Sequence, residues 1–274
     1  MIKKKVKSSI ACIAVLLLGV TGSLEASRCK TTGWFIKTTS CTYNRTHTQS
    51  RPGIYRDVKY QVPEGTPPAG GWPVVVMYQG SFFPVEFSRR QGEPFGGYYE
   101  VKVIEKLLNN GFAVIAPDAG VDLFWETNLP VIYELTADYL FLNRLFDEIR
   151  AGKFGPINSN KKFATGISSG GYNTSRMAVS YPGEFKALAI QSGSYATCSG
   201  PVCIVPGSLP ADHPPTYFIH GWLDLIVPWW SMDLYYDRLR SEGIPTGRYT
   251  DYLASHEWVS ASPDRVYSWF NQYR

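Results

Sequence analysis

A serine at the centre of a Gly-x-Ser-x-Gly pentapeptide, Ser168, is the side chain in this sequence best placed to act as a nucleophile. It follows a short strand-like run, residues 162–167, and precedes a segment of helical character, residues 172–181, which ends before a proline. A tight turn from strand to helix exposes such a serine above a sheet, which is the geometry of a nucleophile elbow. Gly166 and Gly170 fit this turn, because a Cβ at either position would clash across it. A glycine-rich chain can produce the pentapeptide by chance, so the flanking strand and helix carry the prediction.

A serine nucleophile needs a base and an acid, and after an elbow of this kind they follow in the order acid, then histidine. His256 leaves room for an acid and a further element after Ser168, and it lies between a predicted strand and the last predicted helix. Asp224 follows the predicted strand 216–220, and functional groups collect at the carboxyl ends of parallel strands. Asp224 is a lone charge in an apolar loop, which is costly unless the carboxylate has a partner. The sequence therefore predicts a triad of Ser168, Asp224 and His256.

The remaining histidines and carboxylates fit these roles less well. His47 precedes the serine, His213 lies in a loop that enters a strand, and His220 ends a strand and is typical of a core histidine bonded to backbone. Other carboxylates are less suitable as the acid. Asp212 precedes the predicted strand 216–220, and Asp233 and Asp237 fall in the helix that follows it. Glu257 adjoins His256. A surface-loop histidine and a solvated aspartate are the alternatives for His256 and Asp224.

Catalysis at a serine also needs backbone donors for the negative oxygen of the tetrahedral intermediate. Residues 73–78 form a continuous apolar run, which predicts a strand buried on both faces. The loop after this strand supplies one donor in hydrolases with such an elbow. We assign that N–H to Ser81 and the second to Ser169. An ordinary strand-ending turn is the alternative for Ser81.

Strand and helix patterns alternate along the chain, which predicts an α/β fold with a mainly parallel sheet covered by helices on both faces. The predicted strands are residues 55–62, 73–78, 112–116, 162–167, 185–191 and 216–220. The predicted helices are residues 98–110, 137–149, 172–181 and 266–273. The loop 192–215 is too short for a large lid. We expect one catalytic domain over residues 27–274.

The first 26 residues have the pattern of a secretory signal peptide: lysines at positions 3, 4, 5 and 7 precede an apolar segment, residues 10–20. An uncleaved anchor is the alternative. Cleavage after Ala26 leaves 23 basic and 22 acidic side chains, so there is no basic footprint for nucleic acid. We expect a secreted, extracellular protein without a membrane anchor.

Four cysteines remain after such cleavage: Cys29, Cys41, Cys198 and Cys203. An exported protein meets an oxidising compartment, so an even count favours disulfides. Three pairings are possible, and we favour Cys29–Cys41 and Cys198–Cys203 because each closes a short local loop. A zinc site is the rival, but the sequence has no Cys-x-x-Cys pair, so no metal is expected.

Segments along most of the predicted mature chain resemble one family, the secreted poly(3-hydroxyalkanoate) depolymerases that act on medium-chain-length polyesters, the poly(3-hydroxyoctanoate) depolymerases. The segments that carry the resemblance are residues 67–84, 94–100, 122–125, 164–179, 191–201, 228–238 and 256–258. The resemblance implies an α/β-hydrolase fold, the same triad of Ser168, Asp224 and His256, extracellular action on a water-insoluble polymer, and no cofactor. The alternatives are a general carboxylesterase or lipase-like hydrolase of small esters and, less favoured, a non-catalytic polymer-binding protein.

Aromatic residues flank the proposed site in the sequence and would form an apolar surface that adsorbs polyester. They are Phe82, Phe83, Trp222, Trp229, Trp230 and Trp258. Core packing is the alternative for at least half of them. The sequence does not indicate the oligomeric state.

Overall fold

An eight-stranded sheet forms the centre of the molecule, which we describe from a computed structural model covering residues 27–120, 123–129 and 131–274. The predicted signal segment 1–26 lies outside the described residues. In spatial order the strands are β3 (Asn44–Arg51), β4 (Ile54–Gln61), β7 (Ala113–Pro117), β5 (Trp72–Tyr78), β8 (Ile157–Ile167), β9 (Ala187–Gln191), β10 (Thr216–Gly221) and β11 (Thr246–Asp251). The pairs β3–β4 and β4–β7 are antiparallel and all the others are parallel, so the mainly parallel sheet predicted from the sequence is confirmed.

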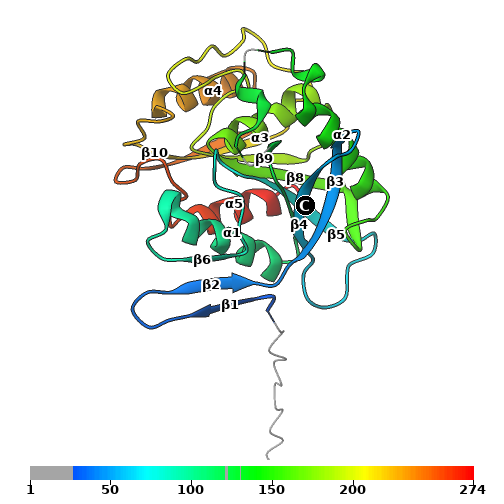
Figure 1. Cartoon of the computed structure of the whole chain (residues 1–274). Helices are drawn as coiled ribbons and strands as arrows, with labels where there is room; N and C mark the ends of the chain where they lie inside the picture. The colour runs from blue at the N-terminus through cyan, green and yellow to red at the C-terminus, as the bar shows by residue number, and fades with distance from the viewer. Residues whose placement is uncertain (1–26, 121–122, 130) are drawn as a thin grey trace, which may run out of the picture.

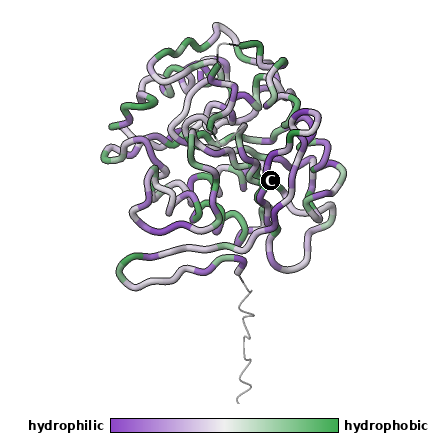
Figure 2. Tube along the Cα trace, in the orientation of Figure 1, coloured by the Kyte–Doolittle hydropathy of each residue, from purple (hydrophilic) through white to green (hydrophobic). Residues whose placement is uncertain are grey.

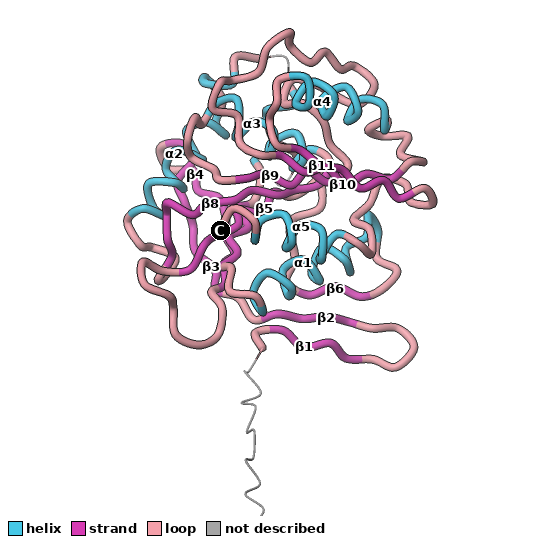
Figure 3. The backbone as a smooth tube through the Cα atoms, turned by 180° about the vertical axis from the view of Figure 1, so that it is seen from behind, coloured by secondary structure: helices cyan, strands magenta, loops and turns pink. Residues whose placement is uncertain are grey.

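Helices cover both faces of this sheet, as predicted, and Figure 3 shows the two layers with the strands between them. On one face lie α1 (Gly97–Asn109) and α5 (Ser262–Asn271). On the other lie α2 (Ala137–Arg150), α3 (Ser169–Ser180) and α4 (Trp229–Ser241). Short 3-10 helices connect these elements: η1 (Pro94–Gly96), η3 (Glu126–Asn128) and η4 (Tyr133–Leu135). Among the described helices, none combines the length and the apolar character that a membrane crossing needs.

The central strands are buried on both faces, which explains their apolar sequences. All five residues of β7 are buried, and so is β5 after its first residue. The outer strand β3 is different: it is rich in polar residues, and the sequence analysis did not predict it. Its register is set by the hairpin that it forms with β4. Its inner face packs on α2, which is distant in the sequence, so its burial depends on tertiary contacts.

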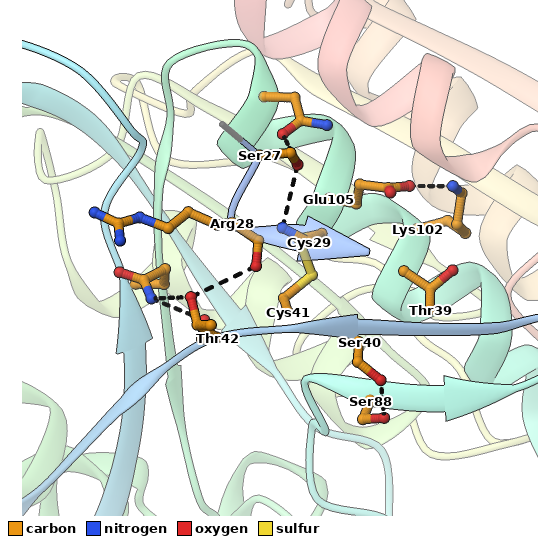
Figure 4. The surroundings of a disulfide bond; sticks show 12 residues. Ser27, Arg28, Cys29, Thr39, Ser40, Cys41, Thr42, Ser88, Lys102 and Glu105 are labelled. Atoms are coloured by element: carbon orange, nitrogen blue, oxygen red, sulfur yellow. Dashed lines mark hydrogen bonds and ion pairs between the residues drawn. A yellow bond between two sulfur atoms is a disulfide. The ribbon is translucent and has the colours of Figure 1, made fainter. Parts of the chain in front are cut away.

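A second, three-stranded sheet lies beside α1, below it in Figure 1. It consists of β1 (Cys29–Thr32), β2 (Thr38–Cys41) and β6 (Ser88–Arg90), none of which the sequence analysis predicted. Figure 4 shows the disulfide between Cys29 and Cys41, and the hydrogen bond of 2.6 Å between the hydroxyls of Ser40 and Ser88 that joins β2 to β6. The turn of the β1–β2 hairpin is apolar (Figure 2), and its Trp34 and Phe35 are strongly exposed.

The structure contains both predicted disulfides, Cys29–Cys41 and Cys198–Cys203. The second lies in the connection from β9 to β10, residues 192–215, all of which are described and contain no helix or strand. An isolated bridge between Ser199 and Val202 lies inside the loop that this disulfide closes. The connection is therefore a short loop rather than a large lid.

Candidate active site

Ser168 occupies the turn between the end of β8 and the start of α3. Its backbone has φ 57° and ψ −121°, a combination that is strained for a residue with a side chain. The turn is held in place by a hydrogen bond of 3.1 Å from the Ser168 N–H to the carbonyl oxygen of Gln191 on β9. This strained strand-to-helix turn has the geometry of a nucleophile elbow.

Glycines on either side of Ser168 make the turn possible. A Cβ at Gly166 would lie 2.6 Å from the carbonyl oxygen of Tyr78, and one at Gly170 would lie 2.2 Å from the same atom. Both distances are far below van der Waals contact, so a larger residue would push β8 or α3 away from β5. The pentapeptide thus reflects close backbone packing.

Asp224 and His256 are hydrogen-bonded to each other although 32 residues separate them. Nδ1 of His256 lies 2.7 Å from Oδ2 of Asp224, and both side chains are buried, at 7% and 3% exposure. Asp224 lies in the loop after β10, and His256 lies in the loop after β11. Because Nδ1 faces the carboxylate, Nε2 is the ring nitrogen that can face a nucleophile.

Hydrogen-bond donors on several sides keep Asp224 ionised. Its Oδ1 accepts hydrogen bonds from the N–H groups of Ile226 and Val227, at 2.9 and 2.8 Å. Nε2 of His220 lies 3.3 Å from Oδ2 and 2.8 Å from the carbonyl oxygen of Val227, so one ring nitrogen reaches both. Burial acts to raise the pKa of Asp224, but hydrogen bonds from His220 and His256 outweigh burial and hold that pKa well below its ordinary value.

Ser168 and His256 line the same cavity, which has a volume of about 360 Å³. Its walls come from the loop after β5, from η1 and the start of α1, and from the loops after β10 and β11. The ring of Phe95 in η1 lies 6.0 Å from the His256 ring and 4.8 Å from the Phe83 ring. The structure therefore places Ser168 and His256 at one largely apolar cavity, and Asp224 is hydrogen-bonded to His256.

The loop after β5 approaches the elbow closely. A Cβ at Gly80 would lie 3.3 Å from Cγ2 of Ile167 and 3.7 Å from Cβ of Ser168. Ser81 follows and lines the cavity beside Ser168, while Phe82 turns the chain with a φ of 66° and donates its N–H to the carbonyl oxygen of Leu123. Ser169 begins α3, where the first N–H groups have no partner within the helix. Both predicted oxyanion donors thus adjoin Ser168.

A hydrogen-bond network that the sequence analysis missed links the end of β5 and the segment around Trp125 to the start of α3. Oγ of Ser169 accepts from the N–H of Trp125 at 2.9 Å and donates to Oδ1 of Asn128 at 2.8 Å. The indole N–H of Trp125 donates to the carbonyl oxygen of Gln79 at 3.1 Å, and Oε1 of Gln79 accepts from the N–H of Ala119. The side chain of Ser169 is therefore structural. The only sequence signal for this network is that a polar residue directly follows Ser168.

The predicted aromatic surface divides into exposed and buried members. Phe82, Phe83, Trp222 and Trp230 are exposed at the molecular surface. Trp229 is half-buried, with its ring 4.8 Å from that of Trp222 and its indole N–H bonded to Thr250. The prediction is wrong for Trp258, which is 1% exposed.

Trp258 fills the core between the sheet and α1 and forms a wall of the cavity. Its indole N–H donates to Oε1 of Glu100 at 3.1 Å. Burial raises the pKa of Glu100 to about 7, so near neutral pH this carboxyl is partly protonated. Neither this contact nor that of His220 with Asp224 is visible in the sequence, because each depends on how loops fold back on the sheet. Within the described ranges, no group of three or more His, Cys, Asp or Glu side chains is placed to hold a metal ion.

Comparison with solved structures identifies the fold. S-formylglutathione hydrolase of Staphylococcus aureus superposes with a TM-score of 0.59 at 13% identity, over 84% of this chain and 98% of that one. The esterase PE8 gives a TM-score of 0.54 at 18% identity, over 78% of this chain and all of the other. At such identities the likeness shows the fold alone, and this fold is that of the α/β-hydrolases.

Sequence comparison identifies the family. No known protein-family profile matches the chain. A poly(3-hydroxyoctanoate) depolymerase of Pseudomonas fluorescens, however, is 61% identical over 236 residues, which are 85% of each protein. The chain therefore belongs to the poly(3-hydroxyoctanoate) depolymerase family, as its motifs predicted.

Proposed function

We propose that this protein is a secreted serine esterase that hydrolyses the ester bonds of water-insoluble medium-chain-length poly(3-hydroxyalkanoate) to oligomers and monomers. The family relationship supports the substrate class, since the relative is by name a depolymerase of poly(3-hydroxyoctanoate). The two disulfides support an extracellular location, together with the signal-like sequence before a single catalytic domain at residues 27–274. The observation that carries the proposed chemistry is the buried Asp224–His256 pair at the cavity that Ser168 also lines.

In this mechanism His256 removes the proton of Ser168 as Oγ attacks the carbonyl carbon of an ester. Asp224, held as a carboxylate, orients the imidazole through Nδ1 and stabilises its charged form. The N–H groups of Ser81 and Ser169 stabilise the oxyanion. His256 gives the proton to the leaving oxygen, and water then releases the acyl group from Ser168.

The polymer itself would rest on the exposed apolar side chains around the cavity, including Phe82, Phe83, Trp222 and Trp230. The β9–β10 connection forms no large cap over the site, which suits a chain presented by a solid surface. A hydrolase of small soluble esters would need no such exposed surface.

The test combines an active-site probe with two polymer emulsions. A fluorophosphonate should label Ser168, and Ser168→Ala should lose both the label and roughly 10³-fold or more of the turnover. Wild-type protein should clear an emulsion of medium-chain polyester faster than one of short-chain polyester. Labelling with turnover of soluble esters but no clearing would instead identify a general carboxylesterase.

A matched pair of histidine variants isolates the base. His47 on β3 also has its Nδ1 bonded to a carboxylate, that of Asp57 at 2.6 Å, but it is exposed and does not line the cavity. His256→Gln should be nearly inactive, whereas His47→Gln should keep wild-type turnover. Equal activity of the two variants would refute a role of His256 as the base.

A further inference from the structure

Ser168 lies on the border between two cavities. The first, of about 360 Å³, is the one that His256 lines. The second, of about 460 Å³, extends to the other side of Ser168, over the start of α3 and the loop that holds the Cys198–Cys203 disulfide. The two cavities share Ser81, Ser168 and Ile226. His256 lines the first and not the second, so the two sides of the nucleophile are chemically different.

Proton transfer decides which half of the ester lies on which side. When the tetrahedral intermediate collapses, the bond between the carbonyl carbon and the ester oxygen breaks, and the acyl group stays on Oγ of Ser168. The proton that His256 took from Ser168 passes from Nε2 to the leaving oxygen, which becomes the hydroxyl group of the released fragment. The leaving oxygen must therefore lie within hydrogen-bond reach of His256, and the alcohol half extends into the first cavity.

The chemistry of a 3-hydroxyalkanoate polyester then places an alkyl chain in this cavity. The carbon attached to the leaving oxygen itself bears the alkyl side chain of its unit. On the acyl side, the carbon that bears the alkyl chain is three bonds away from the leaving oxygen. The alkyl group closest to His256 thus belongs to the leaving unit.

The walls of the two cavities match this division. Aromatic and aliphatic side chains form most of the first cavity: Phe83, Phe95, Ile167, Ile226 and Trp258. Two ionisable side chains also line it: Arg89 donates to Glu93 through Nη1 but leaves its Nε without a partner in the described part of the chain, and Glu100 accepts from Trp258.

Polar groups contribute more of the second cavity. Asn128, Tyr172 and Ser199 line it beside the apolar Phe124, Leu129 and Val227, and the Tyr172 hydroxyl accepts the N–H of Gly200 at 3.0 Å. This wall suits the ester-bearing main chain of a polymer better than an alkyl tail.

We propose that the cavity between Phe83, Phe95, Ile167 and Trp258 receives the alkyl side chain of the leaving unit and so sets the chain-length preference of the enzyme. The proposal rests on the proposed triad, because His256 defines the alcohol side. Each methylene buried in such a cavity would raise kcat/KM by roughly fourfold until the cavity is full.

Gly97 offers a direct way to fill the cavity. It lines the wall and begins α1 with helical dihedral angles, φ −52° and ψ −31°, which any residue can adopt. The three heavy atoms nearest to its Cβ would all belong to the side chain of Arg89, at 3.3 to 3.6 Å. Gly97→Leu should therefore shorten the cavity at little backbone cost. Phe83→Ala, at a half-exposed position, should enlarge it and serves as a second variant if Gly97→Leu does not fold.

The experiment uses two series of soluble esters. In one, acetate esters carry alcohols of one to eight carbons; in the other, methyl esters carry acids of two to eight carbons. In wild-type protein kcat/KM should rise with alcohol length. Gly97→Leu should remove this rise for the longer alcohols, by about tenfold or more, and leave the profile of the acid series unchanged. Phe83→Ala should extend the rise to longer alcohols.

Ser199→Leu is the matched variant in the second cavity, and it should alter the acid series and not the alcohol series. If Gly97→Leu changes the acid series instead, or changes neither series, the assignment is overturned. In both cases fluorophosphonate labelling of Ser168 would persist. A wild-type protein that is not labelled and hydrolyses neither series would instead refute the proposed function.

Discussion

The loops after β10 and β11 carry two kinds of side chain that face opposite ways. Asp224 and His256 point inward and are hydrogen-bonded, whereas Leu225 and Leu253 in the same loops are 91% and 90% exposed. The inward side chains are polar and have fixed partners, and the outward ones are apolar and meet solvent. One pair of loops thus serves two tasks, and changes to the two groups should have separable effects.

The largest expected effect comes from the inward carboxylate. Asp224→Asn should lower the turnover of a soluble ester by about 10⁴-fold, because an amide can neither stabilise the charged imidazole nor keep His256 in the required tautomer. Asp212→Asn, at an exposed position before β10, should keep wild-type turnover. Turnover of Asp224→Asn within tenfold of wild type would show that the buried pair is not catalytic.

A substitution of Trp258, in the loop after β11, measures how much a buried side chain contributes to the free energy of unfolding. Trp258→Ala removes a large core side chain and its hydrogen bond to Glu100, so it should lower the free energy of unfolding by about 3–5 kcal/mol. The measurement is denaturant unfolding followed by fluorescence or circular dichroism. Trp230→Ala is the exposed counterpart and should cost much less. Similar losses in the two variants would remove the distinction between inward and outward aromatics.

Glu100 makes the stability of this buried region depend on pH. Its pKa in the folded state is raised to about 7, above the value near 4.3 of an unfolded chain, so the folded protein holds a proton that the unfolded chain has lost. The free energy of unfolding should therefore decline as pH rises from about 4.5 to about 7, and level off above that. Glu100→Gln cannot ionise and should lose this decline.

The stability of Glu100→Gln relative to wild type should consequently increase between pH 5 and pH 8, by up to about 3 kcal/mol. Thermal unfolding at a series of pH values measures it. Glu105→Gln is the control for removing a carboxyl group from the same helix. A pH-independent difference for Glu100→Gln would mean that Glu100 is ionised throughout this range.

The smallest effect is expected at the exposed surface. Trp230→Ala should weaken adsorption to polyester particles by up to about thirtyfold, which corresponds to about 2 kcal/mol of apolar burial. Turnover of a soluble ester should change much less, because that substrate needs only the triad and the oxyanion donors. Equal losses on both substrates, with a lower melting temperature, would assign Trp230 to the core and place adsorption elsewhere.

Local patterns in the sequence were enough to predict the nucleophile turn, the central strands and the acid–base pair. The Gly-x-Ser-x-Gly pattern can be recognised within a few residues of sequence, although Gly166 and Gly170 are required by close approach to the carbonyl oxygen of Tyr78 on β5. The continuous apolar runs of β5 and β7 report burial on both faces, so these strands and the parallel sheet were predictable. The order of serine, acid and histidine along the chain selected Asp224 and His256 before any contact was known.

Only the tertiary structure decided the features that rest on distant partners. β3 and the small sheet of β1, β2 and β6 are polar, so their pairing depends on neighbours along the sheet rather than on an apolar period. In the sequence Trp258 cannot be distinguished from the exposed tryptophans Trp222 and Trp230. In the structure it lies in the core, where it donates a hydrogen bond to Glu100, 158 residues away. The two cavities beside Ser168 exist because loops that are far apart in the sequence meet at one end of the sheet, and no local pattern predicts that meeting.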